Sequence, residues 1–204
     1  MMPAPLLIND VFWTFQGEGQ FAGHRALFVR MPYCNLSCSW CDTEFNTYKK
    51  WEPLELAKVA TSEKARLAVI TGGEPMLNKN TPRVIEILKG AGFFISCETN
   101  GTAPILDGVD FATVSPKRFT EEKGMKPYFV CDQAFARASE FKYVVDAQFD
   151  MSILARHSPN SIARLSLSPE FNGFNDNLQR IFDYIKEHPE WKISLQTHRW
   201  IGVK

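Results

Sequence analysis

Strand-like apolar runs alternate with helix-length amphipathic segments along most of this 204-residue chain, and this alternation constrains its fold more than any other feature. The strand-like runs are 26–31, 67–71, 93–97, 111–115, 140–145, 163–167 and 192–196, and the helix-like stretches are 53–61, 81–90, 150–155 and 175–187. Several runs are apolar almost throughout, as is typical of strands buried on both faces of a sheet. The pattern predicts a mainly parallel sheet with helical crossovers.

The number of strands limits how far such a sheet can close. Roughly six strands are too few for a closed barrel of eight, so we expect an α/β fold built as a partial, open barrel. The length suits a single domain spanning residues 1–204. No helix is evident between residues 115 and 140, where we expect an irregular connection.

The charge balance argues against two classes of partner. Twenty-three Lys and Arg residues match 23 Asp and Glu residues, so no net field would attract nucleic acid or an anionic membrane. Apolar stretches fall short of the ~20 residues that span a bilayer. The N-terminus lacks the basic region of a signal peptide. With five cysteines interpreted as reduced, we expect a cytoplasmic protein.

Polar residues follow most of the predicted strands at the point where each strand ends. Because the carboxyl ends of parallel strands meet at one edge of a sheet, we expect these residues to surround a common site. They are Arg30, Thr71 to Pro75, Glu98 to Gly101, Ser115 to Lys117, Ser168 to Glu170, and Gln196 to His198.

Three closely spaced cysteines, Cys34, Cys38 and Cys41, follow the first of these strands. Three thiolates on one loop can hold three corners of a four-iron cube and leave the fourth iron open to a small molecule. Zinc is the alternative, although zinc sites usually pair two Cys-x-x-Cys knuckles or add a histidine pair. The histidines here are scattered, at positions 24, 157, 188 and 198. The triplet therefore favours an iron–sulfur cluster and leaves zinc open.

The tetrapeptide Gly72-Gly73-Glu74-Pro75 directly follows a predicted strand. Its two glycines let the backbone approach a ligand closely, and the Glu74 carboxylate can accept hydrogen bonds from an ammonium group. Taken alone, the motif is more typical of a tight turn between a strand and a helix than of a binding site.

The two motifs together resemble the radical S-adenosylmethionine (SAM) superfamily. The shared features are Cys-x3-Cys-x2-Cys with Trp40 before the last cysteine, and Gly-Gly-Glu-Pro at the end of the next strand. The resemblance implies a [4Fe–4S] cluster whose open iron binds SAM, and cleavage of SAM to a 5′-deoxyadenosyl radical. No residue is assigned a catalytic role, since the radical arises on SAM.

Further segments resemble the 7-carboxy-7-deazaguanine synthase family: 15–19, 41–43, 115–117 and 196–202. The family is a group of carbon–nitrogen lyases in the route to queuosine and other 7-deazapurines. Membership would imply conversion of 6-carboxy-5,6,7,8-tetrahydropterin to 7-carboxy-7-deazaguanine with release of ammonia. It would also imply Mg²⁺, electrons from a flavodoxin or ferredoxin, and a homodimer.

The resemblance assigns a role to each matching residue. The cluster would be held by Cys34, Cys38 and Cys41, and Mg²⁺ by Thr43. SAM would contact Trp40, Asp42, Gly73, Glu74, Ser115, Pro116, Lys117, Ser168, Pro169 and Glu170. The pterin would contact Phe15, Gln16, Gly17, Arg30, Thr71 and Lys204. A guanidinium suits the carboxylate of this substrate because it can form two parallel hydrogen bonds.

Two other functions remain open at this point. A glycyl-radical-enzyme activase would share the cysteine spacing but act on a protein. A non-catalytic module would use the same three thiols for zinc. The remaining cysteines, Cys97 and Cys131, are interpreted as structural, Cys97 as a small buried apolar residue.

Overall fold

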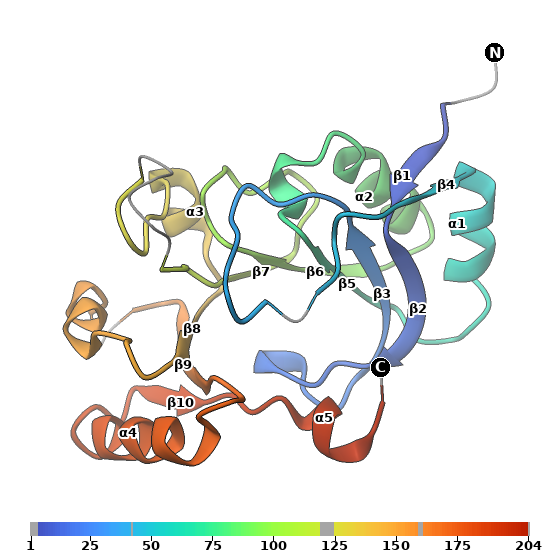
Figure 1. The fold of residues 1–204 in the computed structure, drawn as a ribbon. Coiled ribbons are helices and arrows are strands. Elements are labelled where there is room, and N and C mark those ends of the chain that lie inside the picture. Colours follow the sequence, from blue (N-terminus) through green and yellow to red (C-terminus); the bar gives the residue numbers. More distant parts are fainter. Residues whose placement is uncertain (1–3, 42, 119–124, 159–160, 204) are drawn as a thin grey trace.

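The computed structural model describes residues 4–41, 43–118, 125–158 and 161–203, and its centre is an open sheet of eight strands (Figure 1). Their spatial order is β10 (Trp191–Ile193), β9 (Arg164–Pro169), β8 (Glu140–Val145), β7 (Phe111–Val114), β6 (Phe94–Thr99), β5 (Leu67–Gly72), β3 (Arg25–Met31) and β2 (Asp10–Phe15). Every neighbouring pair is parallel except β2 with β3. The predicted open, mainly parallel α/β architecture is confirmed.

The sheet has more strands than the sequence suggested. The edge strand β2, antiparallel to β3, was not expected, because its sequence mixes polar and aromatic residues and is only partly buried. A separate two-stranded sheet pairs β1 (Leu6–Ile8) with β4 (Lys49–Trp51). Strands of three residues are too short to produce a recognisable alternation of polar and apolar side chains.

Helices cover the outer face of the curved sheet (Figure 1). The predicted helices α1 (Pro53–Ala60), α2 (Thr81–Gly90) and α4 (Phe174–Glu187) are present, and 150–155 falls in a 3-10 helix, η4 (Met151–Arg156). Short helices not expected from the sequence are α3 (Asp132–Arg137), within the connection expected to be irregular, and α5 (Thr197–Ile201). Two more 3-10 turns are η1 (Gly19–Phe21) and η2 (Pro75–Leu77).

The hydrophobic core lies between the sheet and these helices. Val84 and Leu88 of α2 are fully buried in the same apolar cluster as Ile70 of β5 and Ile95 of β6. Cys97 of β6 belongs to that cluster, and burial raises the pKa of its thiol well above the usual range, so its predicted structural role is confirmed. Apolar burial of this kind stabilises the sheet that carries the strand ends.

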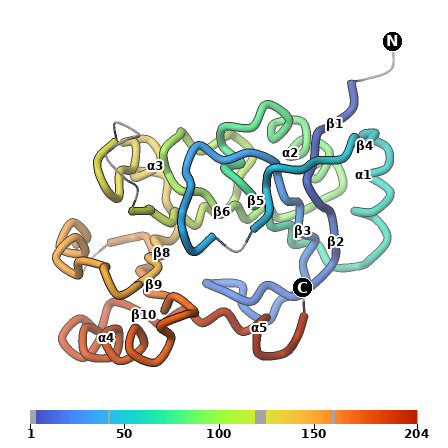
Figure 2. Tube along the Cα trace, viewed as in Figure 1, coloured from blue at the N-terminus to red at the C-terminus, as the bar shows by residue number. Residues whose placement is uncertain are grey.

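The two edges of the sheet are joined across the open side by the chain's last segment (Figure 2). After β10, the Ser194 hydroxyl accepts a hydrogen bond from the backbone N–H of Gly19 at 2.9 Å. Thr197 donates through its N–H to the carbonyl of Gly17 at 3.0 Å. These contacts tie the C-terminal segment to the loop that follows β2. None of the helices in the described ranges is long and apolar enough to cross a membrane.

Candidate functional site

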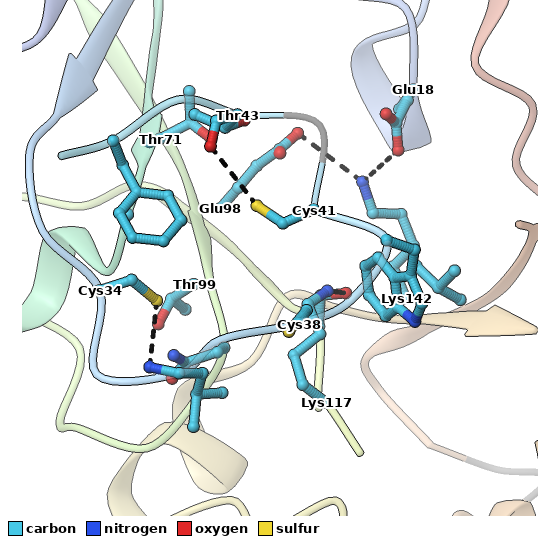
Figure 3. A pocket seen from close by; sticks show the side chains of 18 of the residues that line it. Glu18, Cys34, Cys38, Cys41, Thr43, Thr71, Glu98, Thr99, Lys117 and Lys142 are labelled. Carbon is cyan, nitrogen blue, oxygen red and sulfur yellow. Dashed lines mark hydrogen bonds and ion pairs between the residues drawn. The ribbon is translucent and has the colours of Figure 1, made fainter. Parts of the chain in front are cut away.

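A cavity opens at the carboxyl ends of the parallel strands, beneath the loop that carries the three cysteines (Figure 3). Its walls contain residues from four of the six strand-end segments that the sequence predicted to converge, together with the cysteine loop. The lining residues include Cys34, Cys38, Trp40, Cys41, Thr43, Thr71, Gly72, Gly73, Glu98, Thr99, Asn100, Ser115, Lys117 and Gln196. Residues from the loop after β3 to the segment after β10 are thus brought to one place.

The three cysteines are free thiols on the wall of this cavity. Burial raises the pKa of the Cys34 and Cys38 thiols, and the positive charge of Lys117 acts against this shift at Cys38. Binding as thiolates therefore needs a compensating cation such as iron. In the described part of the chain, no three His, Cys, Asp or Glu side chains converge tightly enough to hold a single metal ion. A four-iron cube binds its thiolates at separate corners, so three spaced thiols on one cavity wall fit such a cluster.

The glycines of the Gly-Gly-Glu-Pro motif allow two chain segments to touch. A Cβ atom on Gly73 would lie 1.8 Å from the carbonyl oxygen of Tyr33, just before the first cysteine. Gly72 has φ of +116°, a conformation that side chains rarely adopt, and its Cβ would lie 2.3 Å from the carbonyl oxygen of Met31. The motif therefore fixes the start of the cysteine loop against the end of β5.

Glu74 is almost fully buried, and its carboxylate links the ends of two strands. It accepts hydrogen bonds from the Thr99 hydroxyl at 2.6 Å and from the backbone N–H groups of Asn100 and Met76 at 2.7 and 3.0 Å. Burial raises the pKa of this carboxyl, although these hydrogen bonds and Lys117 oppose the shift. A carboxylate held this way joins β5 to β6, so its predicted contact with SAM stays a prediction.

Arg30, the next-to-last residue of β3, does not itself line the cavity but contacts Thr43, which does. Its guanidinium donates to the Thr43 hydroxyl at 3.0 Å and lies over the ring of Phe12 at 5.4 Å. Its Nε is buried without a hydrogen-bond partner among the described residues. The residue predicted to bind a carboxylate and the residue predicted to bind Mg²⁺ are therefore in direct contact.

Buried charges form the inner wall of the cavity (Figure 3). The Lys142 ammonium lies 2.6 Å from a carboxylate oxygen of Glu18 and 3.8 Å from one of Glu98. Gln16 donates to Glu98 and Gln196 donates to Glu18, each at 2.9 Å. The side chains of Lys142 and Glu18 are only 6% and 15% exposed, so this pair is largely shielded from water.

The two charges of this pair stabilise each other. Burial alone would raise the pKa of the Glu18 carboxyl, but the charge and hydrogen bond of Lys142, with Gln196, lower it to about 2. Burial would lower the pKa of Lys142, yet Glu18 and Glu98 raise it above its usual range. Both groups of the pair are therefore ionised at neutral pH.

A second, smaller cavity continues from the first, because the two share Glu18, Trp40 and Gln196. The second is also lined by Ser168, Pro169, Glu170 and Phe171 at the end of β9. The Lys117 ammonium lies over the Trp40 ring at 5.2 Å and donates to the Ser115 hydroxyl. Glu74 lines neither of these two adjoining cavities, whereas seven of the residues predicted to bind SAM do: Trp40, Gly73, Ser115, Lys117, Ser168, Pro169 and Glu170.

Some predicted site residues lie away from these cavities. The Phe15 ring is 40% exposed and packs under the Arg25 guanidinium at 5.3 Å. Gly17 has no room for a side chain, because a Cβ atom would lie 2.1 Å from the ring of His198. The buried Pro116 joins Ser115 to Lys117. The predicted residues Asp42 and Lys204 lie outside the described residues.

The structure adds Glu18 and Lys142 to the candidate site, whereas Glu98 and Gln196 were expected at its edge without a ligand being assigned to them. A signal for Lys142 was present: Glu140, Lys142 and Val144 recur at every second position of β8 and so share one face. Below Lys142, buried Glu140 accepts from the hydroxyls of Ser166 at 2.5 Å and Thr113 at 3.3 Å. Two charged residues, Glu140 and Lys142, on one face of an otherwise apolar strand indicate that this face of the sheet lines a polar site.

Similarity to known proteins covers almost the whole chain. Residues 28–148 match the family model described as the radical SAM superfamily. A 7-carboxy-7-deazaguanine synthase from Haemophilus influenzae is 31% identical over 97% of this chain and 93% of its own length. A second protein with that name, from Synechocystis sp., is 33% identical over the same shares.

The fold agrees with this similarity. The crystal structure of QueE from Escherichia coli superposes with a TM-score of 0.76 at 28% sequence identity, over 94% of this chain and 93% of that one. Neither the activase nor the zinc module is favoured by these comparisons.

Proposed function

This chain belongs to the 7-carboxy-7-deazaguanine synthase family of the radical SAM superfamily, and from that membership we propose how its cavity binds the ligands of the reaction. The enzyme is a carbon–nitrogen lyase that converts 6-carboxy-5,6,7,8-tetrahydropterin to 7-carboxy-7-deazaguanine and releases ammonia. The observation that carries this conclusion is similarity over 97% of the chain to a protein with this activity.

The [4Fe–4S] cluster is assigned to Cys34, Cys38 and Cys41, whose thiols are unpaired and share one cavity wall. When bound, the cluster supplies an electron to SAM, and the resulting cleavage of SAM begins the reaction on the pterin. The surrounding chain orients the ligands and limits the access of water to them.

SAM is proposed to lie along the hollow between the cysteine loop and the end of β9. Trp40, held under the Lys117 ammonium, offers a flat face to the adenine. Burial and repulsion by Lys142 lower the pKa of Lys117, while nearby acidic groups and Cys38 act in the opposite direction. An anionic carboxylate next to Lys117 would favour its charged form. Ser168, Pro169 and Glu170 are proposed to contact the far end of SAM.

The pterin is proposed to occupy the part of the cavity between Arg30 and the buried charges. Its carboxylate would bind the Arg30 guanidinium, beside Thr71 at the end of the neighbouring strand. Its N–H groups would donate to the carboxylates of Glu18 and Glu98, which Lys142 and the two glutamines hold in place. Backbone groups of Phe15 and Gly17 would complete this wall.

Magnesium is proposed to bind at the Thr43 hydroxyl, within reach of the carboxylate that Arg30 holds. Mg²⁺ keeps several waters and often takes only one or two ligands from a protein. A metal ion placed there would orient the substrate carboxylate and offset its charge.

Several properties of the working enzyme are further proposals. The reaction needs an external reductant, and we propose a flavodoxin or ferredoxin. We also propose a homodimer, and a single domain that spans the chain. The five unpaired cysteines are consistent with a reducing compartment, for which we propose the cytoplasm.

The test is an anaerobic assay with the reconstituted protein. Incubation with 6-carboxy-5,6,7,8-tetrahydropterin, SAM, dithionite and Mg²⁺ should yield 7-carboxy-7-deazaguanine and ammonia in equal amounts. A Cys34→Ala variant should be colourless and inactive, because one corner of the cluster loses its thiolate. An iron-loaded, SAM-binding protein that leaves the pterin unchanged would overturn the assigned substrate.

A further inference from the structure

A third hollow, separate from the two adjoining cavities of the site, lies on the outer side of the cysteine loop and shares Cys34 with the first of them. Its other walls include Leu7 of β1, Tyr33, and Leu77 with Lys79 after η2. Cys34 is therefore part of a thin wall with the reaction site on one side and this outer hollow on the other. Since an electron for the cluster must come from outside the enzyme, this thin wall offers a route for it at Cys34.

The surface around the hollow has the apolar character of a docking site. Tyr33, Tyr48 and Leu77 are 49%, 45% and 53% exposed. The rings of the two tyrosines are 5.9 Å apart, so they form one continuous aromatic face. Exposed tyrosines are enriched where proteins meet, because one end of the side chain is apolar and the hydroxyl stays polar.

The exposed charge at the hollow is positive. Of its two charged lining residues, Glu74 is buried with its carboxylate bonded, whereas Lys79 is exposed. Lys50 lies directly across the β1–β4 ladder from Leu7 and is also exposed. The acidic residues that follow on the chain, Glu52 and Glu55, form the capping box of α1. Two lysines beside an aromatic face suit an acidic partner.

We propose that this outer hollow, defined by Leu7, Tyr33, Tyr48, Leu77, Lys50 and Lys79, is the docking surface for a small acidic electron-carrier protein. The inference rests on the proposed function, which requires a reductant. One electron leaves the carrier's redox group and enters the cluster beside Cys34, so that the carrier is oxidised, the cluster is reduced and no atom is transferred. A surface defined by six residues is smaller than a standard stable interface and therefore fits a transient complex.

The test is a charge reversal, Lys50→Glu with Lys79→Glu, in the reconstituted enzyme. The matched control is Lys186→Glu with Lys192→Glu, two exposed lysines on α4 and β10 at the other end of the sheet (Figure 1). Affinity for a reduced acidic flavodoxin is measured by anaerobic calorimetry at two salt concentrations. SAM cleavage is followed in parallel with flavodoxin and with dithionite.

The proposal predicts at least ~10-fold weaker flavodoxin binding for the first pair of substitutions, on the scale of two favourable charge contacts. The control pair should bind flavodoxin as tightly as the wild-type enzyme does. The affinity of the wild-type enzyme should fall at high salt, because salt screens the charges. SAM cleavage with dithionite should be the same in all of these proteins. A Leu77→Ser variant should weaken binding by loss of an apolar contact, with little effect of salt on that loss.

Equal flavodoxin affinity in wild type and the Lys50/Lys79 variant would overturn the docking surface, as would equal losses in both pairs. A wild-type enzyme that cleaves SAM with dithionite but does not convert the pterin would refute the proposed function instead. The two failures are therefore distinguished by the reductant and by the product measured.

Discussion

Replacing Lys142 by methionine should destabilise the fold and reduce the dependence of its stability on acid. The substitution keeps an unbranched side chain of similar length but removes the ammonium group. It leaves the carboxylates of Glu18 and Glu98 facing each other inside the protein, without the cation that lies 2.6 and 3.8 Å from them. An uncompensated buried charge is far more costly than an intact pair.

The pKa shift of Glu18 gives the size of the stabilisation that depends on Lys142. Its pKa falls from the ordinary value of 4.5 to about 2 in the folded protein. At about 1.4 kcal/mol for each pKa unit, the ionised form contributes about 3 kcal/mol to the free energy of unfolding. Because the folded pKa is the lower one, this contribution is complete above pH 4.5 and is lost as the pH falls toward 2. Roughly 2 kcal/mol should disappear between pH 6 and pH 3.

Urea unfolding of the metal-free protein, followed by circular dichroism at pH 7, 5 and 3, measures both effects. Lys142→Met should lower the free energy of unfolding at pH 7 by about 3 kcal/mol and lose less than wild type on acidification. Lys192→Met, on an exposed position of β10, is the matched control and should change it by less than about 0.5 kcal/mol. A loss below about 1 kcal/mol for Lys142→Met, or an unchanged acid dependence, would refute the reasoning.

Three other substitutions test further parts of the account. Glu74→Gln should lower the free energy of unfolding by about 2 kcal/mol, because a neutral amide replaces a carboxylate that binds three buried donors; urea denaturation that shows no loss would contradict this. Arg30→Lys should raise KM for the carboxypterin about 10-fold, with a smaller change in kcat, because it removes the two-pronged contact; steady-state assays under nitrogen decide. Burial, with the charge of Arg156, lowers the pKa of His157 from 6.5 to about 4, so stability present above pH 6.5 is lost on acidification toward pH 4. His157→Gln should remove that part of the loss, as judged by thermal midpoints at pH 7 and 5.

The parallel part of the sheet was predictable because its strands are buried on both faces. Runs such as 67–71 and 140–145 are apolar over most of their length, and a sheet of parallel strands brings their carboxyl ends to one edge. Chain order alone therefore placed Thr71, Ser115 and Gln196 around one site, as the cavity lining confirms. The edge strand β2 and the β1–β4 pair escaped notice, because short or half-exposed strands leave little periodic signal.

The ion pairs of the site could not be predicted from local sequence patterns. Lys142 lies 124 residues from Glu18 along the chain, and only the folded sheet brings them together. Glu74 shows the same limit: its motif suggested an acceptor for an ammonium group, and only the fold shows that its carboxylate also joins β5 to β6. Whether a carboxylate faces a ligand or a neighbouring strand is decided by tertiary packing.

Every proposed ligand contact depends on an iron–sulfur cluster held by Cys34, Cys38 and Cys41, with one iron open to SAM. Electron paramagnetic resonance of the reconstituted, dithionite-reduced protein, recorded with and without SAM, tests it most directly. The account predicts a [4Fe–4S] signal that changes shape when SAM is added and is missing in Cys38→Ala. A signal that SAM leaves unaltered, or a protein that takes up zinc and no iron, would contradict it.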